Sequence, residues 1–204
     1  MSIFGDINST DHFDKAILET LQVWLPTYLA EHERQSGRAV RSYERPADFV
    51  VAEDHAKWTE NRVPCVMVVG GDISDMRVMP DGYAGWYDYE VGAYVAAGGD
   101  DAEQAAKRMA KAYMAAIRSV LVQRPSLGGI ATATVPVSES SGLDEDNRSV
   151  AIRIGSFRSL VHGLGLPGGG PVSPDPPDDP DDPHPDWPVV GDTSVTFNAE
   201  PIDG

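Results

Sequence analysis

Residues 83 to 124 limit the possible folds most strongly, because they predict one long strand followed by one long helix. In residues 83–97 (YAGWYDYEVGAYVAA) large apolar side chains alternate with others, the period-two pattern of a strand with one buried face. Two glycines follow and end the strand. In residues 101–123 apolar side chains recur every three or four positions, as on the buried face of a helix. Pro125 ends this helix because proline lacks an N–H donor and disfavours helix in the residue before it.

This strand and helix also predict how they pack. The polar side of the strand carries Asp88 and Glu90, which we expect to contact solvent or a neighbouring chain. Asp101 is the expected N-cap of the helix, with Gln104 as its partner in a capping box. Many residues on the apolar face of the helix are alanines. Small side chains let a helix lie close to a flat partner, so we expect this face to pack on the sheet.

A second helix is predicted near the start of the chain, over residues 10–36. Its apolar residues recur at helical spacing, and Thr10 or Asp11 is the expected cap. Pro26 lies inside the pattern and removes one hydrogen bond, which predicts a kink or break near Trp24. Gly37 is placed to end the helix in the left-handed conformation.

The remaining elements are shorter. Three short strands are predicted, at residues 40–43, 49–52 and 64–70. The third is a continuous run of apolar residues, so we expect it at the centre of the sheet. Residues 71–82 are rich in turn formers and predict a protruding hairpin or flap, with a brief edge strand at 77–79. Residues 128–137 predict another strand, followed by a polar turn.

The last strand of the body is predicted over residues 148–161. Its apolar positions change phase next to Gly155, which predicts a β-bulge there. The fold class expected from all these elements is α+β: a mostly antiparallel sheet with two amphipathic helices packed on one face, plus an extended Pro/Asp-rich C-terminal tail.

Composition divides the chain into a body, residues 1–162, and a tail. Residues 163–188 read as a Gly/Pro/Asp-rich tether, since nine prolines and six aspartates between 167 and 188 cannot form a core. Residues 189–204 regain strand-forming side chains, including Val195 and Phe197, and predict a docking segment that adds itself to the edge of another sheet. A disordered end is the open alternative.

Charge argues against nucleic-acid binding. The formal net charge is −16, and nine of the 32 acidic residues lie beyond Arg158, where there is no Lys or Arg. The chain up to Arg158 therefore carries a net charge of −7. Affinity for nucleic acid depends on Lys and Arg neutralising phosphates, so an acidic surface would let DNA pass without gripping it.

No pattern in the sequence indicates catalysis, a cofactor or a metal. A G-x-G-x-x-G run begins at Gly163, but prolines follow it instead of the helix that a dinucleotide site needs. There is no cluster of Cys and His for zinc, and Cys65, the single cysteine, lies in an apolar run that predicts a buried thiol. No apolar run is long enough to span a membrane, and the N-terminus lacks the features of a signal peptide.

The order of elements over residues 10–161 resembles the tail-terminator (tail-completion) proteins of long-tailed bacteriophages. The matching motifs are the N-terminal helix with Leu18, Leu21, Trp24 and Leu25, the run VPCVMVV at 63–69, VGAYV at 91–95, GDDAEQAA at 99–106, YMAAIRSVL at 113–121 and PSLGG at 125–129. The resemblance implies an α+β protein that forms a hexameric ring on the tail tube, stops its polymerisation and faces the head connector. Its implied partners are further copies of itself, the tube protein and a connector or stopper protein, with genomic DNA passing unbound through the lumen and the virion as its location.

Two other functions stay open: another neck or tail-tube-like protein, and a small cytosolic module that binds a peptide at its sheet edge. In a ring, projecting loops reach a neighbour or the tube end, so residues 71–82 are the expected assembly contact. The residues expected at the assembly interface are Asp72, Asp75, Arg77, Asp81, Asp88, Glu90, Val195 and Phe197.

Overall fold

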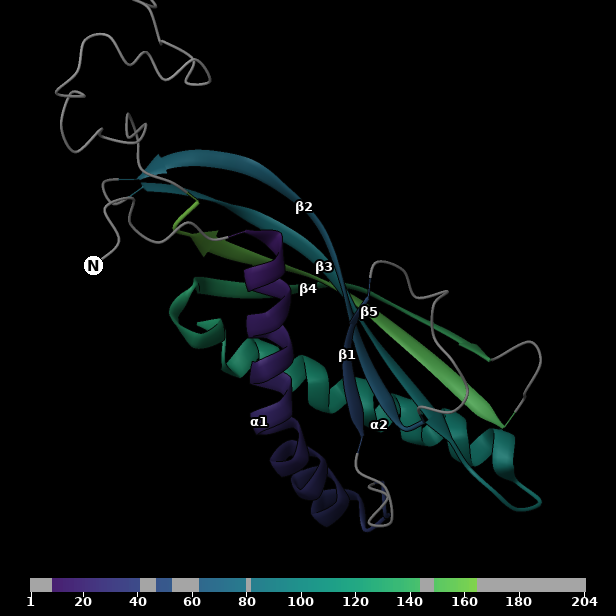
Figure 1. Ribbon diagram of the computed structural model, residues 1–204. Helices are drawn as coiled ribbons and strands as arrows, with labels where there is room; N and C mark the ends of the chain where they lie inside the picture. The colour runs from purple at the N-terminus through teal and green to yellow at the C-terminus, as the bar shows by residue number, and fades with distance from the viewer. Residues whose placement is uncertain (1–8, 41–46, 53–62, 80–81, 144–148, 165–204) are drawn as a thin grey trace, which may run out of the picture. The chain divides into compact units, whose positions relative to one another are not determined.

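Two helices and five strands make up the described part of the chain (Figure 1). The computed structural model describes residues 9–40, 47–52, 63–79, 82–143 and 149–164. The elements are, in order, α1 (Thr10–Ser36), β1 (Asp48–Ala52), β2 (Cys65–Met79), β3 (Gly82–Ala96), α2 (Ala102–Gln123), a 3-10 turn (Leu127–Gly129), β4 (Ala131–Leu143) and β5 (Val150–His162).

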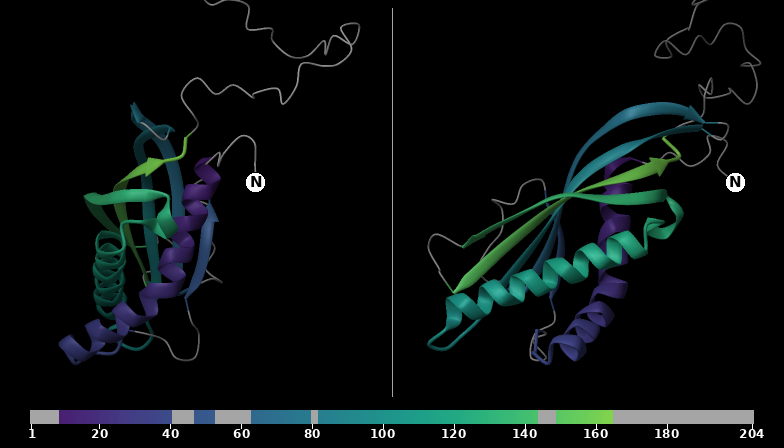
Figure 2. Two further views of the ribbon diagram at one scale, coloured as in Figure 1. Left: turned by 90° about the vertical axis from the view of Figure 1, so that its left-hand side faces the viewer. Right: turned by 180° about the vertical axis from the view of Figure 1, so that it is seen from behind.

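The strands form one sheet in the order β1-β2-β3-β5-β4. β1 runs parallel to β2, and the other three pairings are antiparallel. Both helices pack against one face of this sheet, where their apolar residues join those of β2, β3 and β5 in one core (Figures 1 and 2). The predicted α+β class is therefore confirmed for the described residues.

The core is built on β3, as its alternating pattern predicts. Tyr87, Tyr89, Val91, Ala93 and Val95 point to the helix side and are buried. The rings of Phe13, Tyr87, Tyr89 and Phe157 follow one another across this face, with successive centroids 5.3, 5.8 and 5.7 Å apart. Aromatic rings at these distances add to the stability that burial provides.

The helix α1 confirms the prediction with one shift at its start. Ser9 is the N-cap, not Thr10 or Asp11, and its backbone N–H donates to Nδ1 of His12 at 3.1 Å. The helix continues through Pro26, and its ribbon changes direction about halfway along instead of breaking (Figure 1). Gly37 ends it with φ 65°, the left-handed cap that a glycine adopts without steric cost.

The start of α2 differs from the predicted capping box. Asp101 occupies the N-cap position, but its side chain makes no capping hydrogen bond. Its backbone, at φ −103° and ψ 26°, is not in the extended conformation from which a cap side chain reaches back to the helix. Further along, Ala112 and Ala116 are buried beside depressions that α1 residues also line, so the alanine-rich face of α2 meets α1 as well as the sheet.

The hairpin or flap predicted at residues 71–82 is right in part, because 77–79 are strand and form a hairpin with β3, but no turn separates them from the strand before. β2 continues through this segment to Met79, and the pairing with β3 survives two register shifts, between Gly70 and Ile73 and between Ser74 and Arg77. Bulges of this kind absorb extra residues without ending a strand. The polar and glycine residues that read as a turn therefore lie in the bulged part of a strand.

The bulge predicted at Gly155 lies instead in the partner strand. β5 pairs with β3 without interruption, while β4 shifts register between Pro136 and Ser138, opposite Phe157 and Ser156. The phase change arises because β5 has apolar residues on both faces. β4 also extends to Leu143, so much of the predicted polar turn is strand.

The other face of the sheet has a smaller apolar cluster. Cys65, Met67 and Tyr94 are buried there, with Val50 and Ile152 packed against them, so the predicted burial of Cys65 is confirmed. The strand predicted at 49–52 is β1, whereas Val40 is not in a strand and 41–43 lie outside the described residues. The chain divides into two units, Met1–Pro171 and Val172–Gly204, and the second lies wholly outside the described residues.

Candidate assembly surface

The sheet has a long edge at the far half of β2. β1 pairs with β2 only from Cys65 to Val69, so among the described strands residues 70–79 pair with β3 alone. β4 forms the opposite edge and pairs only with β5. Exposed strand edges present rows of backbone donors and acceptors that pair readily with another chain. This sheet therefore carries two edges on which a further strand can be added.

Large apolar side chains are exposed along these edges. On β2, Met76 and Val78 are each 66% exposed and Met79 is 44% exposed. On β4, Val135 is 46% and Val137 59% exposed. Single exposed apolar residues are ordinary, but a group of them at an open strand edge is typical of a contact surface. The sequence predicted an edge strand at 77–79 but no strand at residue 76 and no open edge at 135–137, and none of these five residues was among the predicted interface residues.

The predicted interface residues of β2 lie in its bulged part. Asp72 falls within the first register shift and is exposed. Asp75 falls within the second and has φ 51°, a left-handed conformation that is uncommon for residues other than glycine. Arg77 is exposed and pairs with Ala84. All three lie on the edge segment that the sequence singled out.

Asp75 and Asp88 both pair with Arg158 of β5, which was not among the predicted interface residues. The Nε atom of Arg158 lies 2.7 Å from Oδ1 of Asp88, and its Nη2 lies 3.7 Å from Oδ2 of Asp75. The same Nη2 donates a hydrogen bond of 2.8 Å to Oγ of Ser74. Arg158 thus ties the far half of β2 to β5 across the strand between them, on the face without helices.

Glu90 lies on the same helix-free face, one step along β3. It accepts a hydrogen bond of 3.2 Å from Oγ of Ser156, which in turn accepts one of 3.2 Å from Oγ of Ser138. The predicted pair Asp88 and Glu90 therefore shares a face as expected, and each contacts β5 within its own chain. The other predicted interface residues lie outside the described part of the chain: Asp81, Val195 and Phe197.

A buried hydrogen bond fixes the point where β2 leaves β1. The hydroxyl of Tyr87 donates to Oδ1 of Asp14 at 2.6 Å, and both residues are buried between α1 and the sheet. Burial raises the pKa of Asp14, and burial together with the Asp14 carboxylate raises the pKa of Tyr87. Gly70 leaves room for the pair, since a Cβ there would lie 2.3 Å from the Tyr87 hydroxyl.

A second buried polar group joins β3, β4 and β5. The Tyr89 hydroxyl lies 3.1 Å from Oγ of Ser159, which lies 2.8 Å from Oγ1 of Thr134. Burial raises the pKa of Tyr89 to about 12, so its hydroxyl keeps its proton at neutral pH. Every hydroxyl in this group has a partner, which is the condition under which buried polar groups are tolerated.

Within the residues that the structure describes, no three His, Cys, Asp or Glu side chains gather as a metal site would require. Among the helices that the structure describes, neither is long and apolar enough to cross a membrane.

Comparison with known proteins finds distant structural similarity but no matching family. No family model matches the chain, and no curated protein matches it. Among solved structures, the chain is similar to one from the virion of a native gene transfer agent (GTA) particle, with a TM-score of 0.37 and 16% sequence identity. The match covers 69% of this chain and 93% of that chain. At this TM-score and identity, the similarity establishes neither a shared fold nor a shared function.

Proposed function

We propose that this chain is a structural protein of a phage-type virion whose copies join edge to edge in a ring, of six as the resemblance implies, that caps the tail tube. The ring ends tube polymerisation and forms part of the joint between head and tail. The observation that carries the proposal is the pair of open strand edges, residues 70–79 of β2 and β4, with exposed apolar side chains on both.

Two different edges on one sheet suit a ring. If β2 of one copy meets β4 of the next, the contact is head-to-tail, and head-to-tail contacts close into a ring when the rotation allows. The resemblance of residues 10–161 to tail terminators supports this arrangement, because it implies both the α+β fold and a ring. The gene transfer agent chain is also part of a virion, but its TM-score is too low for that similarity to be evidence.

Charge supports a role in which DNA passes without being held. The chain has a net charge of −16, and on the helix-free face the three carboxylates Asp75, Asp88 and Glu90 outnumber the one arginine, Arg158, that pairs with two of them. A lumen lined by carboxylates repels phosphates and leaves DNA free to slide. The proposal includes no catalytic step, cofactor or metal.

A peptide-binding module is the second candidate, because an open edge also accepts an extended peptide. The same edge is equally compatible with another neck component or a tube-like protein. The three are separated by imaging the protein mixed with tail tubes in negative stain. A ring seated on tube ends supports the proposal. A monomer that leaves the ends bare contradicts it, and growth of longer tubes from this chain alone identifies a tube protein.

A further inference from the structure

The helix α2 is basic, although the chain is strongly acidic. It contains four cationic residues and one acidic residue, Glu103. The whole chain carries −16. The cations are Lys107, Arg108, Lys111 and Arg118. This concentration of positive charge is not explained by the strand edges described above.

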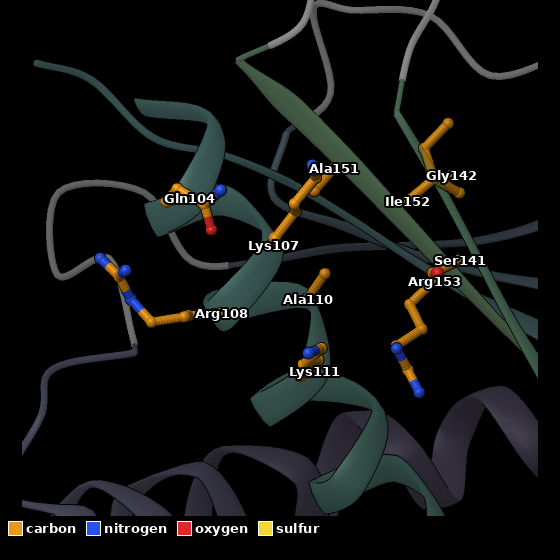
Figure 3. Close-up of a pocket in the computed structure, with 10 residues that line it drawn as sticks. All are labelled: Gln104, Lys107, Arg108, Ala110, Lys111, Ser141, Gly142, Ala151, Ile152 and Arg153. Carbon is orange, nitrogen blue, oxygen red and sulfur yellow. The ribbon is translucent and has the colours of Figure 1, made fainter. Parts of the chain in front are cut away.

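The first three of these cations border a depression between α2 and the strands β4 and β5. Its volume is about 430 Å³, and Arg153 of β5 lines the opposite side (Figure 3). Arg108 reaches away from the strands in this view. Arg108 and Lys111 also line a second depression of about 620 Å³ toward the end of α1, together with Arg38. These two side chains therefore form a cationic ridge between two depressions.

The ridge residues differ from the surrounding cations in their pairing. Lys107 donates a hydrogen bond to Glu103, while Arg118 and Arg153 both pair with Glu139. Within the described part of the chain, no ion pair involves Arg108 or Lys111, and both side chains are exposed. Two adjacent cations without a counter-charge attract a carboxylate-rich segment.

We propose that the cationic ridge of Arg108 and Lys111 binds the aspartate-rich segment 175–186 of a second copy of this chain. That segment carries six aspartates and no Lys or Arg, so its charge complements the ridge. Prolines between the aspartates favour an extended backbone, which spreads the carboxylates along a line and lowers the ordering cost of binding. Arginine and lysine both pair with carboxylates, arginine through two parallel hydrogen bonds.

The reach of the chain favours a second copy over the same copy. The described chain ends at Leu164, just after β5, whereas the depression borders Ala151 to Arg153 at the other end of that strand. At about 3.3 Å per residue this separation is about 40 Å. Asp175, 11 residues beyond Leu164, reaches about 36 Å when fully extended and falls short, whereas Asp178 reaches about 46 Å and the later aspartates reach further. A neighbouring copy can therefore offer all six aspartates, and the same copy only the later ones.

Nucleic acid is the less suitable polyanion. Its binding gains from many phosphates neutralised at once, and the ridge offers two unpaired cations in a chain with a net charge of −16. The contact between copies rests on the proposed ring, but its test does not need tail tubes.

The first test measures binding of a synthetic peptide of residues 173–187 to the full chain in which all six aspartates of 175–186 are asparagine. We expect binding that weakens with salt, and at least about fivefold weaker binding when Arg108→Gln and Lys111→Gln are added. The control Lys15→Gln removes an exposed cation of α1 and should leave binding unchanged. A peptide with asparagine in place of aspartate should not bind.

Two results of this titration overturn the inference. One is that the acidic peptide binds the ridge variant as well as it binds the chain with the ridge intact. The other is that a single-stranded DNA of 15 nucleotides binds more tightly than the peptide and loses binding in the ridge variant, which would make the ridge a nucleic-acid site.

The second test distinguishes a second copy from the same copy. One chain carries Arg108→Gln and Lys111→Gln, the other carries the six asparagines, and each is labelled at its N-terminus for energy transfer. Neither variant can make the contact alone, but the mixture restores one ridge and one acidic segment. We expect transfer in this mixture, and none between donor-labelled and acceptor-labelled chains that both carry Arg108→Gln and Lys111→Gln. Absence of transfer there, with the peptide still bound, places the contact within one copy and overturns the inference, while ring formation on tubes would still test the proposed function separately.

Discussion

The Tyr87 hydroxyl donates a hydrogen bond to Oδ1 of Asp14 over 2.6 Å and so joins β3 to α1 across 73 positions of sequence. The two side chains lie next to Gly70, where β2 leaves its partner β1 and begins its open edge. The contact therefore holds α1 against the part of the sheet from which the candidate assembly surface extends.

Removing the acceptor should destabilise the fold. The Asp14→Ala variant leaves the buried Tyr87 hydroxyl without its carboxylate, at an expected cost of about 1–3 kcal/mol in the free energy of unfolding. Asp14→Asn keeps an acceptor oxygen and should cost less. Urea denaturation of the two variants at pH 7 measures the difference. Equal losses would show that the hydrogen bond is not what the carboxylate contributes.

The same carboxyl group predicts a pH dependence. Burial raises the pKa of Asp14 above its ordinary value of 3.8, so the folded state binds this proton more tightly than the unfolded state. Its contribution to stability is therefore present below pH 3.8 and is lost as the pH rises from there through the raised pKa. The unfolding free energy of the parent minus that of Asp14→Asn should therefore fall as the pH rises across that window. A difference that rises with pH would contradict the assignment.

Gly70 should not tolerate a side chain. A Cβ there would lie 2.3 Å from the Tyr87 hydroxyl and 2.5 Å from Oδ2 of Asp14, so Gly70→Ala forces the pair apart. We expect a loss of about 1–3 kcal/mol in stability from this overpacking. The matched control is Gly142→Ala in β4, where a Cβ meets nothing within 4 Å. Thermal melts of both variants check this, and similar melting temperatures would refute the close packing at Gly70.

The alanines of α2 predict a further packing effect. Ala112 and Ala116 are 5% and 4% exposed, so Ala112→Leu or Ala116→Leu should overpack the helix contact and cost about 1–3 kcal/mol. Ala115, half-buried beside the same depressions, is the control, because a leucine there has room to extend outward. If both variants at the buried positions had the same denaturant midpoint as the parent, this face of α2 would lie outside the core.

Local patterns predicted the elements that have a clear period. The alternation from Tyr87 to Val95 and the helical spacing in α2 depend only on neighbouring residues, and both elements are confirmed. Residues 70–75 interrupted the apolar run with glycines and aspartates, so the pattern predicted a turn where β2 in fact continues as a bulged strand paired with β3. Pairing with a distant strand overrode the local preference.

The site was less predictable because it depends on which strands are neighbours. Arg158 contacts Asp88 only because β5 pairs with β3, a register that no short stretch of sequence encodes. The exposed edge of β2 likewise depends on β1 being short. The aspartates of 71–82 could be selected from their place between two strands, while the apolar residues Met76 and Val78 beside them required the fold.

The length of tail tubes assembled with this protein tests the central claim most directly. Tubes are grown from the tail-tube protein proposed as its partner, with the parent chain, with Met76→Glu/Val78→Glu, or with the control Lys15→Gln, and their lengths are measured in negative stain. We expect the parent and the control to cap the tubes and stop growth, and the β2-edge variant, still folded by circular dichroism, to leave ends bare and tubes overlong. Overlong tubes with the parent chain would contradict the proposed function, and capped tubes with the β2-edge variant would contradict the assignment of the open strand edge as its assembly surface.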